Sequence, residues 1–163
     1  MVHFKNPVLF VRNIETSKDF YINVLEQEIE FDFGKNIAFK SGLAIWEIPE
    51  YHIIKQKINN KDLRNASCYR TEMYFETTDI NNFETRINLL EVKTLHEVIE
   101  ETWGQKTIRF FDPDFHLIEV GESMKTFINR LLNNNMTISE ISEKTSVPTE
   151  VIKQLIGIED NTI

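Results

Sequence analysis

The stretch TIRFFDPDFHLIEVGE, residues 107–122, decides the fold. Its centre, Asp112-Pro113-Asp114, is a turn, because proline presets φ and aspartate side chains bond nearby backbone groups. The apolar segments KTIRFF (106–111) and FHLIEV (115–120) on either side predict two strands. The stretch therefore predicts two consecutive strands joined by a tight turn.

The residues before this stretch predict a strand, a helix and a further strand. YRTEMYFET (69–77) alternates like a strand, and Asp79 is a good cap for a helix. A third segment, 92–99, is also expected to be a strand. The apolar stripe of the helix consists of Ile80, Phe83, Ile87 and Leu90. Together with 106–120, these segments give the order β-α-β-β-β.

The first part of the chain predicts the same order. Strands are expected at 5–11, 27–33, 36–40 and 43–48, with a helix that begins at Asn13. Residues 49–67 are polar and predict a linker with a surface helix. At an offset of 66 residues Asn13 falls on Asp79, and Asn6 falls on Glu72. Two such units are too small to bury their sheets separately, so we expect them to pack side by side.

These motifs carry a resemblance to a known family. TIRFFDPDFHLIEVGE, VLFVRNIETSKDFYINVL (8–25) and the duplicated order resemble the vicinal oxygen chelate superfamily of glyoxalase, bleomycin-resistance and extradiol dioxygenase proteins. The resemblance covers roughly residues 5–122. Phe115 stands where the family usually has glycine. Trp-Gly-Gln (103–105) and the C-terminal tail resemble an uncharacterised branch of the family.

The resemblance implies an α+β fold of tandem βαβββ modules, which form a curved mixed sheet around a cavity. Residues 1–122 would form this domain, with modules at about 5–48 and 69–120, and residues 123–163 would form a helical extension. The implied function is to act on or bind a small molecule in the cavity between the modules. The enzyme classes implied are metal-dependent lyase, isomerase or dioxygenase.

The resemblance also implies a metal site on the first and last strands of each module. Glu72 and Glu119 are the expected ligands in the second module, and they are also the expected catalytic residues. Asn6 and Glu47 are the candidates in the first module, although a turn shorter by one residue would put Trp46 in place of Glu47. Such a metal would chelate two neighbouring substrate oxygens and stabilise an enolate or similar anion.

The residue types leave two interpretations of this set open. Four oxygen ligands favour Mn²⁺ or Mg²⁺ over Zn²⁺ or Ni²⁺. A buried carboxylate can instead pair with Arg70 or Arg109, which favours a metal-free protein that binds or sequesters an organic ligand. His96 is kept as a possible proton-transfer group, whereas Cys68 has no basic neighbour that would activate it. The aromatic residues Trp46, Tyr74 and Trp103 fit either a ligand cavity or the core.

The amino-acid composition limits the classes of protein to which this chain can belong. The 163 residues are 41% hydrophobic and carry a formal net charge of −8. This charge argues against nucleic-acid binding and against adhesion to anionic membranes. No apolar run approaches the length of a membrane span. A lone cysteine excludes an internal disulfide, so a cytoplasmic protein is expected.

The tail predicts three helices, at 122–134, 137–145 and 149–156. Thr137 and Glu140 have the spacing of a capping box, and Thr149-Glu150 after Pro148 is expected to be a second capping signal. The last two helices look like a helix-turn-helix, but from residue 121 on there are only four cations against six carboxylates. We therefore expect the tail to pack on the sheets or on a second copy in a homodimer. The alternative is a regulatory arm.

Overall fold

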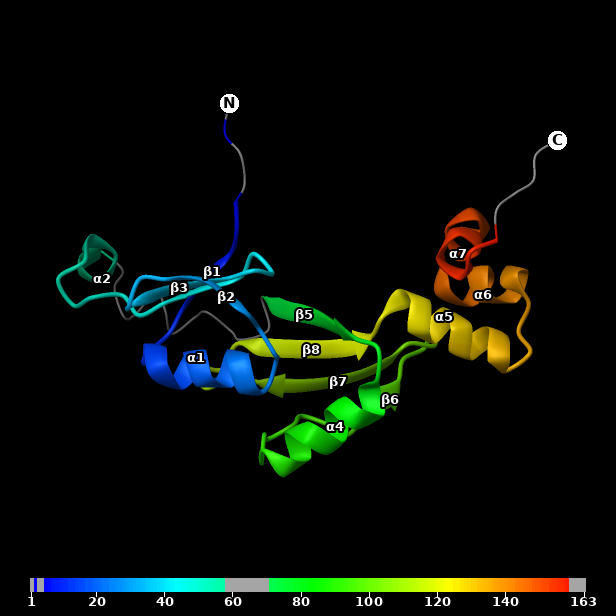
Figure 1. Cartoon of the computed structure of the whole chain (residues 1–163), viewed down its shortest axis with the longest axis horizontal. Helices are drawn as coiled ribbons and strands as arrows, with labels where there is room; N and C mark the ends of the chain where they lie inside the picture. Colours follow the sequence, from blue (N-terminus) through cyan, green and yellow to red (C-terminus); the bar gives the residue numbers. More distant parts are fainter. Residues whose placement is uncertain (1, 3–4, 58–70, 159–163) are drawn as a thin grey trace. The chain divides into compact units, whose positions relative to one another are not determined.

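The computed structural model describes residues 2, 5–57 and 71–158. His3, Cys68 and Arg70 lie outside these residues, as does the start of the predicted strand 69–77. The chain forms two compact units: residues 1–72 with 111–117, and residues 73–110 with 118–163. The predicted α+β class is confirmed, because each half of the chain contributes a four-stranded sheet with one long helix (Figure 1).

The first sheet has the order β1-β4-β3-β2, in which β1 and β4 are parallel and the other pairs antiparallel. Leu9 and Val11 are buried in alternation with the exposed Val8 and Phe10, so one face of the sheet meets the core. Tyr21 of the helix packs there on Phe39, with ring centroids 5.7 Å apart. The elements are β1 (Val8–Phe10), α1 (Ile14–Asn23), β2 (Ile29–Asp32), β3 (Asn36–Phe39), β4 (Ala44–Trp46) and α2 (Ile53–Lys57).

The second sheet has the order β5-β8-β7-β6. Phe83 of its helix packs on Phe110 of β7, and Ile108, Ile118 and Val120 are buried on the same side. The side of β7 and β8 that faces away from this core therefore carries the alternate residues. The elements are β5 (Glu72–Thr77), α4 (Ile80–Leu89), β6 (Ile99–Glu100), β7 (Lys106–Phe111) and β8 (Leu117–Glu122).

The predicted strand 92–99 is wrong over most of its length. Only Ile99 and Glu100 form β6, and a single bridge joins Thr94 to Phe110. The intervening backbone is instead held by other groups: Val98 N–H donates to the Glu84 carboxylate at 2.8 Å. A side chain on α4 thus satisfies a backbone group that a longer strand would have paired in the sheet.

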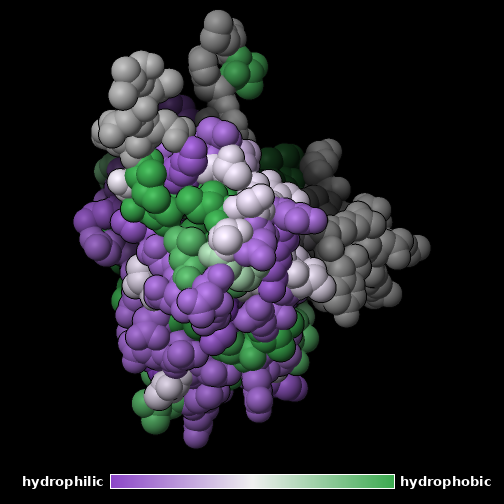
Figure 2. Space-filling model, turned by 90° about the vertical axis from the view of Figure 1, so that its right-hand side faces the viewer, coloured by the Kyte–Doolittle hydropathy of each residue, from purple (hydrophilic) through white to green (hydrophobic). Residues whose placement is uncertain are grey.

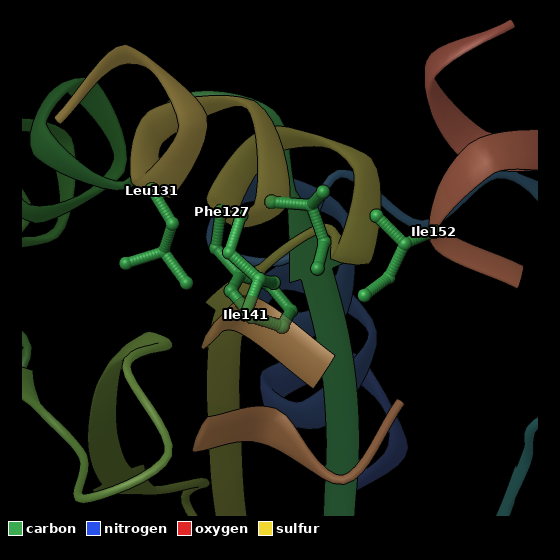
Figure 3. Packing of buried hydrophobic residues seen from close by; sticks show 5 residues of the cluster. Phe127, Leu131, Ile141 and Ile152 are labelled. Atoms are coloured by element: carbon green, nitrogen blue, oxygen red, sulfur yellow. The ribbon is translucent and has the colours of Figure 1, made fainter. Parts of the chain in front are cut away.

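The tail folds into three helices that share a core. Phe127, Ile128, Leu131, Ile141 and Ile152 are buried together (Figure 3). The helices are α5 (Met124–Asn133), α6 (Ile138–Thr145) and α7 (Thr149–Ile156). Figure 2 shows the face on the side of these helices as mostly hydrophilic, with smaller hydrophobic areas.

The two helix-start signals predicted in the tail had different outcomes. The capping box of Thr137 and Glu140 is present with both of its hydrogen bonds. The second capping signal is wrong, because α7 begins after Pro148 without a side-chain cap. Proline has the extended ψ of a cap residue but offers no side-chain acceptor. None of the helices in the described part of the chain is long and apolar enough to cross a bilayer.

Candidate functional site

A charged network lies on the side of the second sheet that faces away from α4. Arg109 of β7 donates through Nη1 to Glu101 Oε1 at 2.7 Å and makes an ion pair with Glu119 of β8. Thr107 donates its hydroxyl to the same Glu101 oxygen at 3.0 Å. Strand alternation explains the grouping, because Thr107 and Arg109 lie opposite the buried Ile108 and Phe110.

The network keeps two carboxylates close to one cation. The Glu119 side chain is 7% exposed, that of Glu101 16%, and that of Arg109 23%. The hydrogen bond from Arg109 lowers the pKa of Glu101, against the opposing effect of burial. The three side chains thus carry a net charge of −1 when both acids are ionised. Of the partners predicted for Glu119, Arg109 is the one found among the described residues.

The other predicted ligands lie on different elements. Glu72 is the first residue of β5 and is exposed. Asn6 precedes β1 and donates its amide to its neighbour Pro7 at 3.2 Å. Glu47 follows β4 and accepts from Ile14 N–H at 2.8 Å and from Lys35 at 2.5 Å. The Glu47 carboxylate therefore satisfies the first backbone donor of α1, and these contacts lower its pKa.

Trp46, the alternative to Glu47 in the first module, is the last residue of β4. It pairs with Phe10 across β1 and β4, and their rings meet edge to face at 6.0 Å. Within the described residues, no three His, Cys, Asp or Glu side chains lie close enough together to share a metal ion. Asn6, Glu47, Glu72 and Glu119 as a ligand set remain a prediction.

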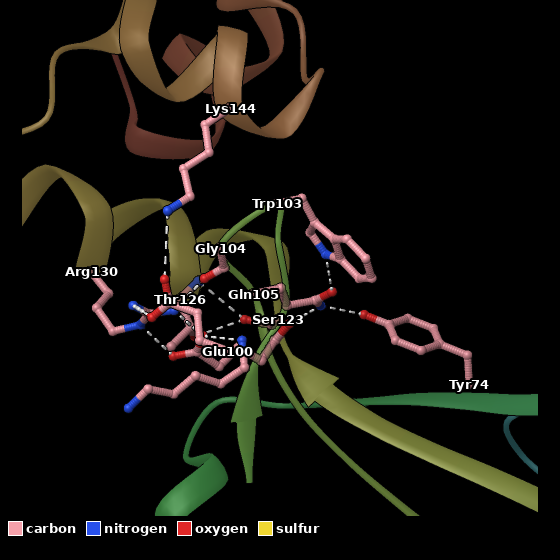
Figure 4. Close-up of polar contacts among 11 residues, drawn as sticks. Tyr74, Glu100, Trp103, Gly104, Gln105, Ser123, Thr126, Arg130 and Lys144 are labelled. Carbon is pink, nitrogen blue, oxygen red and sulfur yellow. Dashed lines mark hydrogen bonds and ion pairs between the residues drawn. The ribbon is translucent and has the colours of Figure 1, made fainter.

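A second polar group, which sequence reasoning missed, surrounds Gln105 (Figure 4). Its amide nitrogen donates at 2.7 Å both to Tyr74 Oη and to the Glu122 carbonyl, and its oxygen accepts from Trp103 Nε1 at 3.2 Å. Tyr74 Oη in turn donates to Glu76 Oε1 at 3.1 Å. Burial raises the pKa of Tyr74 to about 12. The available signal was the Trp-Gly-Gln string, which served only as a family marker.

His96, the predicted proton-transfer candidate, lies in the loop between α4 and β6. Its Nδ1 is 2.7 Å from the Glu97 carbonyl, so Nδ1 carries the proton in the neutral ring. Within the described residues Nε2 is buried without a hydrogen-bond partner. The role of His96 in proton transfer remains a prediction.

The Asp-Pro-Asp turn is a structural feature of the first unit. Asp114 accepts from Arg12 Nε at 2.7 Å and from Ser17 at 2.9 Å. Asp112 accepts from the Tyr21 hydroxyl at 3.0 Å and lies 2.8 Å from His116 Nδ1. The hydrogen bonds of Asp112 and Asp114 therefore hold this turn against α1.

Stability should depend on pH through His116. Its hydrogen bond to Asp112 raises the pKa of the imidazole above its usual value of 6.5. A histidine whose pKa is raised by folding contributes its full stabilisation at pH values below its pKa in the unfolded state. This contribution is lost as pH rises through its pKa in the folded state. The stability difference between wild type and His116→Gln should therefore be larger at pH 6 than at pH 9 in urea unfolding. An equal difference at both pH values would contradict this.

The backbone conformation of Phe115 should be strained. Its φ is +68°, where the family uses glycine, and its side chain is 64% exposed. Phe115→Ala and Phe115→Gly both remove the ring contact with Phe111. The glycine variant should be more stable than the alanine variant by about 1 kcal/mol, because only alanine keeps the strain. Thermal unfolding of the two variants measures this, and a more stable alanine variant would disprove it.

Comparisons with known proteins agree with this fold. Residues 4–125 match the model of the glyoxalase-like domain family. A protein of unknown function from Agrobacterium tumefaciens str. C58 is similar in structure, with a TM-score of 0.63 and 36% identity over 76% of this chain and 96% of that chain. Among curated proteins, none matches the sequence.

Two more distant structures share the fold. A lactoylglutathione lyase from Agrobacterium tumefaciens has a TM-score of 0.54 and 21% identity over 74% of this chain and 93% of its own. The fosfomycin resistance protein FosX from Listeria monocytogenes has a TM-score of 0.55 and 18% identity over 76% and 95%. Since the family model spans most of the chain, this protein belongs to the glyoxalase-like domain family of the vicinal oxygen chelate superfamily.

Proposed function

We propose that this protein binds an organic small molecule on the face of the second sheet that carries Glu101, Arg109 and Glu119, and that it does so without a metal ion. The observation that supports this is the ion pair of Glu119 with Arg109. In the family, the position of Glu119 would hold a metal, whereas here the Arg109 guanidinium already pairs with its carboxylate. The network is partly exposed, so a ligand has access to it.

The chemistry of the network favours a ligand rich in hydrogen-bond donors. Arg109 holds the two carboxylates in fixed positions, and a fixed acceptor loses little conformational entropy when a ligand binds. Ionised carboxylates accept strong hydrogen bonds from hydroxyl, amide or amine groups. The residues would thus bind and orient a ligand.

The metal-dependent interpretation needs ligands that have other partners in this protein. A bound metal would supply Lewis-acid stabilisation of an anionic substrate oxygen. Glu47 is held by Ile14 N–H and Lys35, and Glu119 by Arg109. A metal would have to displace Arg109 to use Glu119. These partners argue against a tight site, so we derive no step through a metal.

Removal of the competing cation provides the experiment. Elemental analysis of wild type purified without chelators should find no stoichiometric metal, and added Mn²⁺ should not shift its melting temperature. Arg109→Met leaves Glu101 and Glu119 without this cation, so Mn²⁺ should stabilise that variant. A panel of polar aromatic and aliphatic molecules should still include compounds that stabilise wild type in EDTA. Stoichiometric metal that is lost in Glu119→Gln would overturn the proposal.

A further inference from the structure

Two exposed aromatic rings in the second unit are hydrogen-bonded to the same amide, that of Gln105, and one of them is also hydrogen-bonded to a carboxylate. The side chains of Tyr74 and Trp103 are exposed, at 48% and 38% of the residue surface. Figure 4 shows both rings extending from the Gln105 amide, which connects them through hydrogen bonds. The Tyr74 hydroxyl donates to Glu76, which is itself exposed.

The polar atoms of both rings already make hydrogen bonds within the protein. Trp103 Nε1 donates to Gln105, and Tyr74 Oη accepts from Gln105 while it donates to Glu76. Gln105 is only 8% exposed and is anchored to the Glu122 carbonyl. The ring surfaces are thus what the two residues offer to a ligand, and the rings are held in place before it binds.

Gly121 makes this arrangement possible. A Cβ atom at this position would lie 2.8 Å from Gln105 Nε2 and 3.2 Å from Tyr74 Cε2. A side chain at this position would therefore force the Gln105 amide to shift and would crowd the Tyr74 ring. The absence of a side chain at Gly121 thus permits the close approach of β8 to Gln105 and Tyr74.

Two carboxylates act on Tyr74, so the charge around this ring is negative. Glu76 bonds the Tyr74 hydroxyl, and the charge of Glu119 also acts on Tyr74 and raises its pKa, after burial as the main cause. Arg109 is held by Glu101 and Glu119, and Lys144 lies 3.6 Å from Glu100. Aromatic faces attract cations through their quadrupole.

We propose that Tyr74, Trp103 and Glu76 form a subsite for an organic cation, such as an alkylammonium group of the ligand. The organic cation specifies the class of ligand for the proposed function, and the subsite proposal rests on that function. Glu76 supplies the countercharge, and the two rings supply apolar contact with the alkyl substituents. Gln105 keeps the rings in position.

Choline and its neutral isostere 3,3-dimethyl-1-butanol test the proposal. The chain has two tryptophans, so a Trp46→Phe background leaves Trp103 as the sole tryptophan reporter. Choline should change the Trp103 fluorescence in a saturable manner, and it should bind at least about fivefold more tightly than the isostere. Equal binding of the two compounds, or binding of neither, would overturn the proposal.

Variants separate charge from packing. Glu76→Gln should weaken choline binding about threefold or more and leave the isostere unchanged, because it removes only the charge. Glu143→Gln, an exposed change on α6, serves as the control and should leave both unchanged. Choline binding that is unaffected by Glu76→Gln would refute the subsite. If panel compounds stabilise the protein in EDTA without any preference for cations, this inference fails while the proposed function stands.

Discussion

Replacement of Arg130 by methionine is expected to lower the free energy of unfolding by about 3–5 kcal/mol. Arg130 of α5 binds both carboxylate oxygens of Glu122, at 2.9 Å from Nε and 2.7 Å from Nη2. It also donates to the Gly104 carbonyl at 2.6 Å. The Glu122 side chain is only 4% exposed, so methionine would leave a buried carboxylate without its cation. Urea unfolding followed by circular dichroism measures the loss.

Lys144→Met is the matched control for this change. Lys144 likewise makes an ion pair, with Glu100, but the two charged atoms are 3.6 Å apart and the lysine side chain is 34% exposed. Its loss should cost less than about 1 kcal/mol. If Arg130→Met cost no more than Lys144→Met, the ion pair with Glu122 would not be what holds α5 to the second sheet.

Truncation of Ile152 to alanine is expected to cost about 2–5 kcal/mol, because it opens a cavity in the core of the three tail helices. Ile152 of α7 is fully buried against the apolar residues of α5 and α6. Hydrogen exchange should report the loss as faster exchange in α5, α6 and α7. Urea unfolding gives its magnitude.

The adjacent Val151 supplies the control for the tail core. It lies on the same helix and is 37% exposed, so Val151→Ala should change stability by less than about 1 kcal/mol. Equal losses in the two variants would show that the tail has no packed core of its own.

The local elements could be predicted because their signals are local. The three tail helices match their predicted ranges within about two residues, since the apolar spacing and the Thr137–Glu140 box lie within one or two turns. The duplicated β-α-β-β-β order was also predicted, from strand alternation and from the caps Asn13 and Asp79. The strand predicted over residues 92–98 was wrong because Glu84, on another element, provides a partner for the backbone of this segment.

The candidate site could be predicted only in part. Alternation put Glu119 on the face away from the helix, but it could not choose between a metal, Arg70 and Arg109 as its partner. The choice between Glu47 and Trp46 depended on one residue of turn length, which periodicity does not fix. The contacts of Gln105 with Tyr74 and Glu122 join residues far apart in sequence, so no local pattern reveals them.

The central claim is that the face with Glu101, Arg109 and Glu119 binds ligand without a metal. The most direct measurement is the mapping of backbone amide chemical shifts with the stabilising compounds from the panel, in EDTA. We predict that the largest shifts fall in residues 105–109 and 118–121, and that Glu119→Gln weakens them. Shifts confined to other elements, or shifts that appear only after a divalent metal is added, would contradict the account.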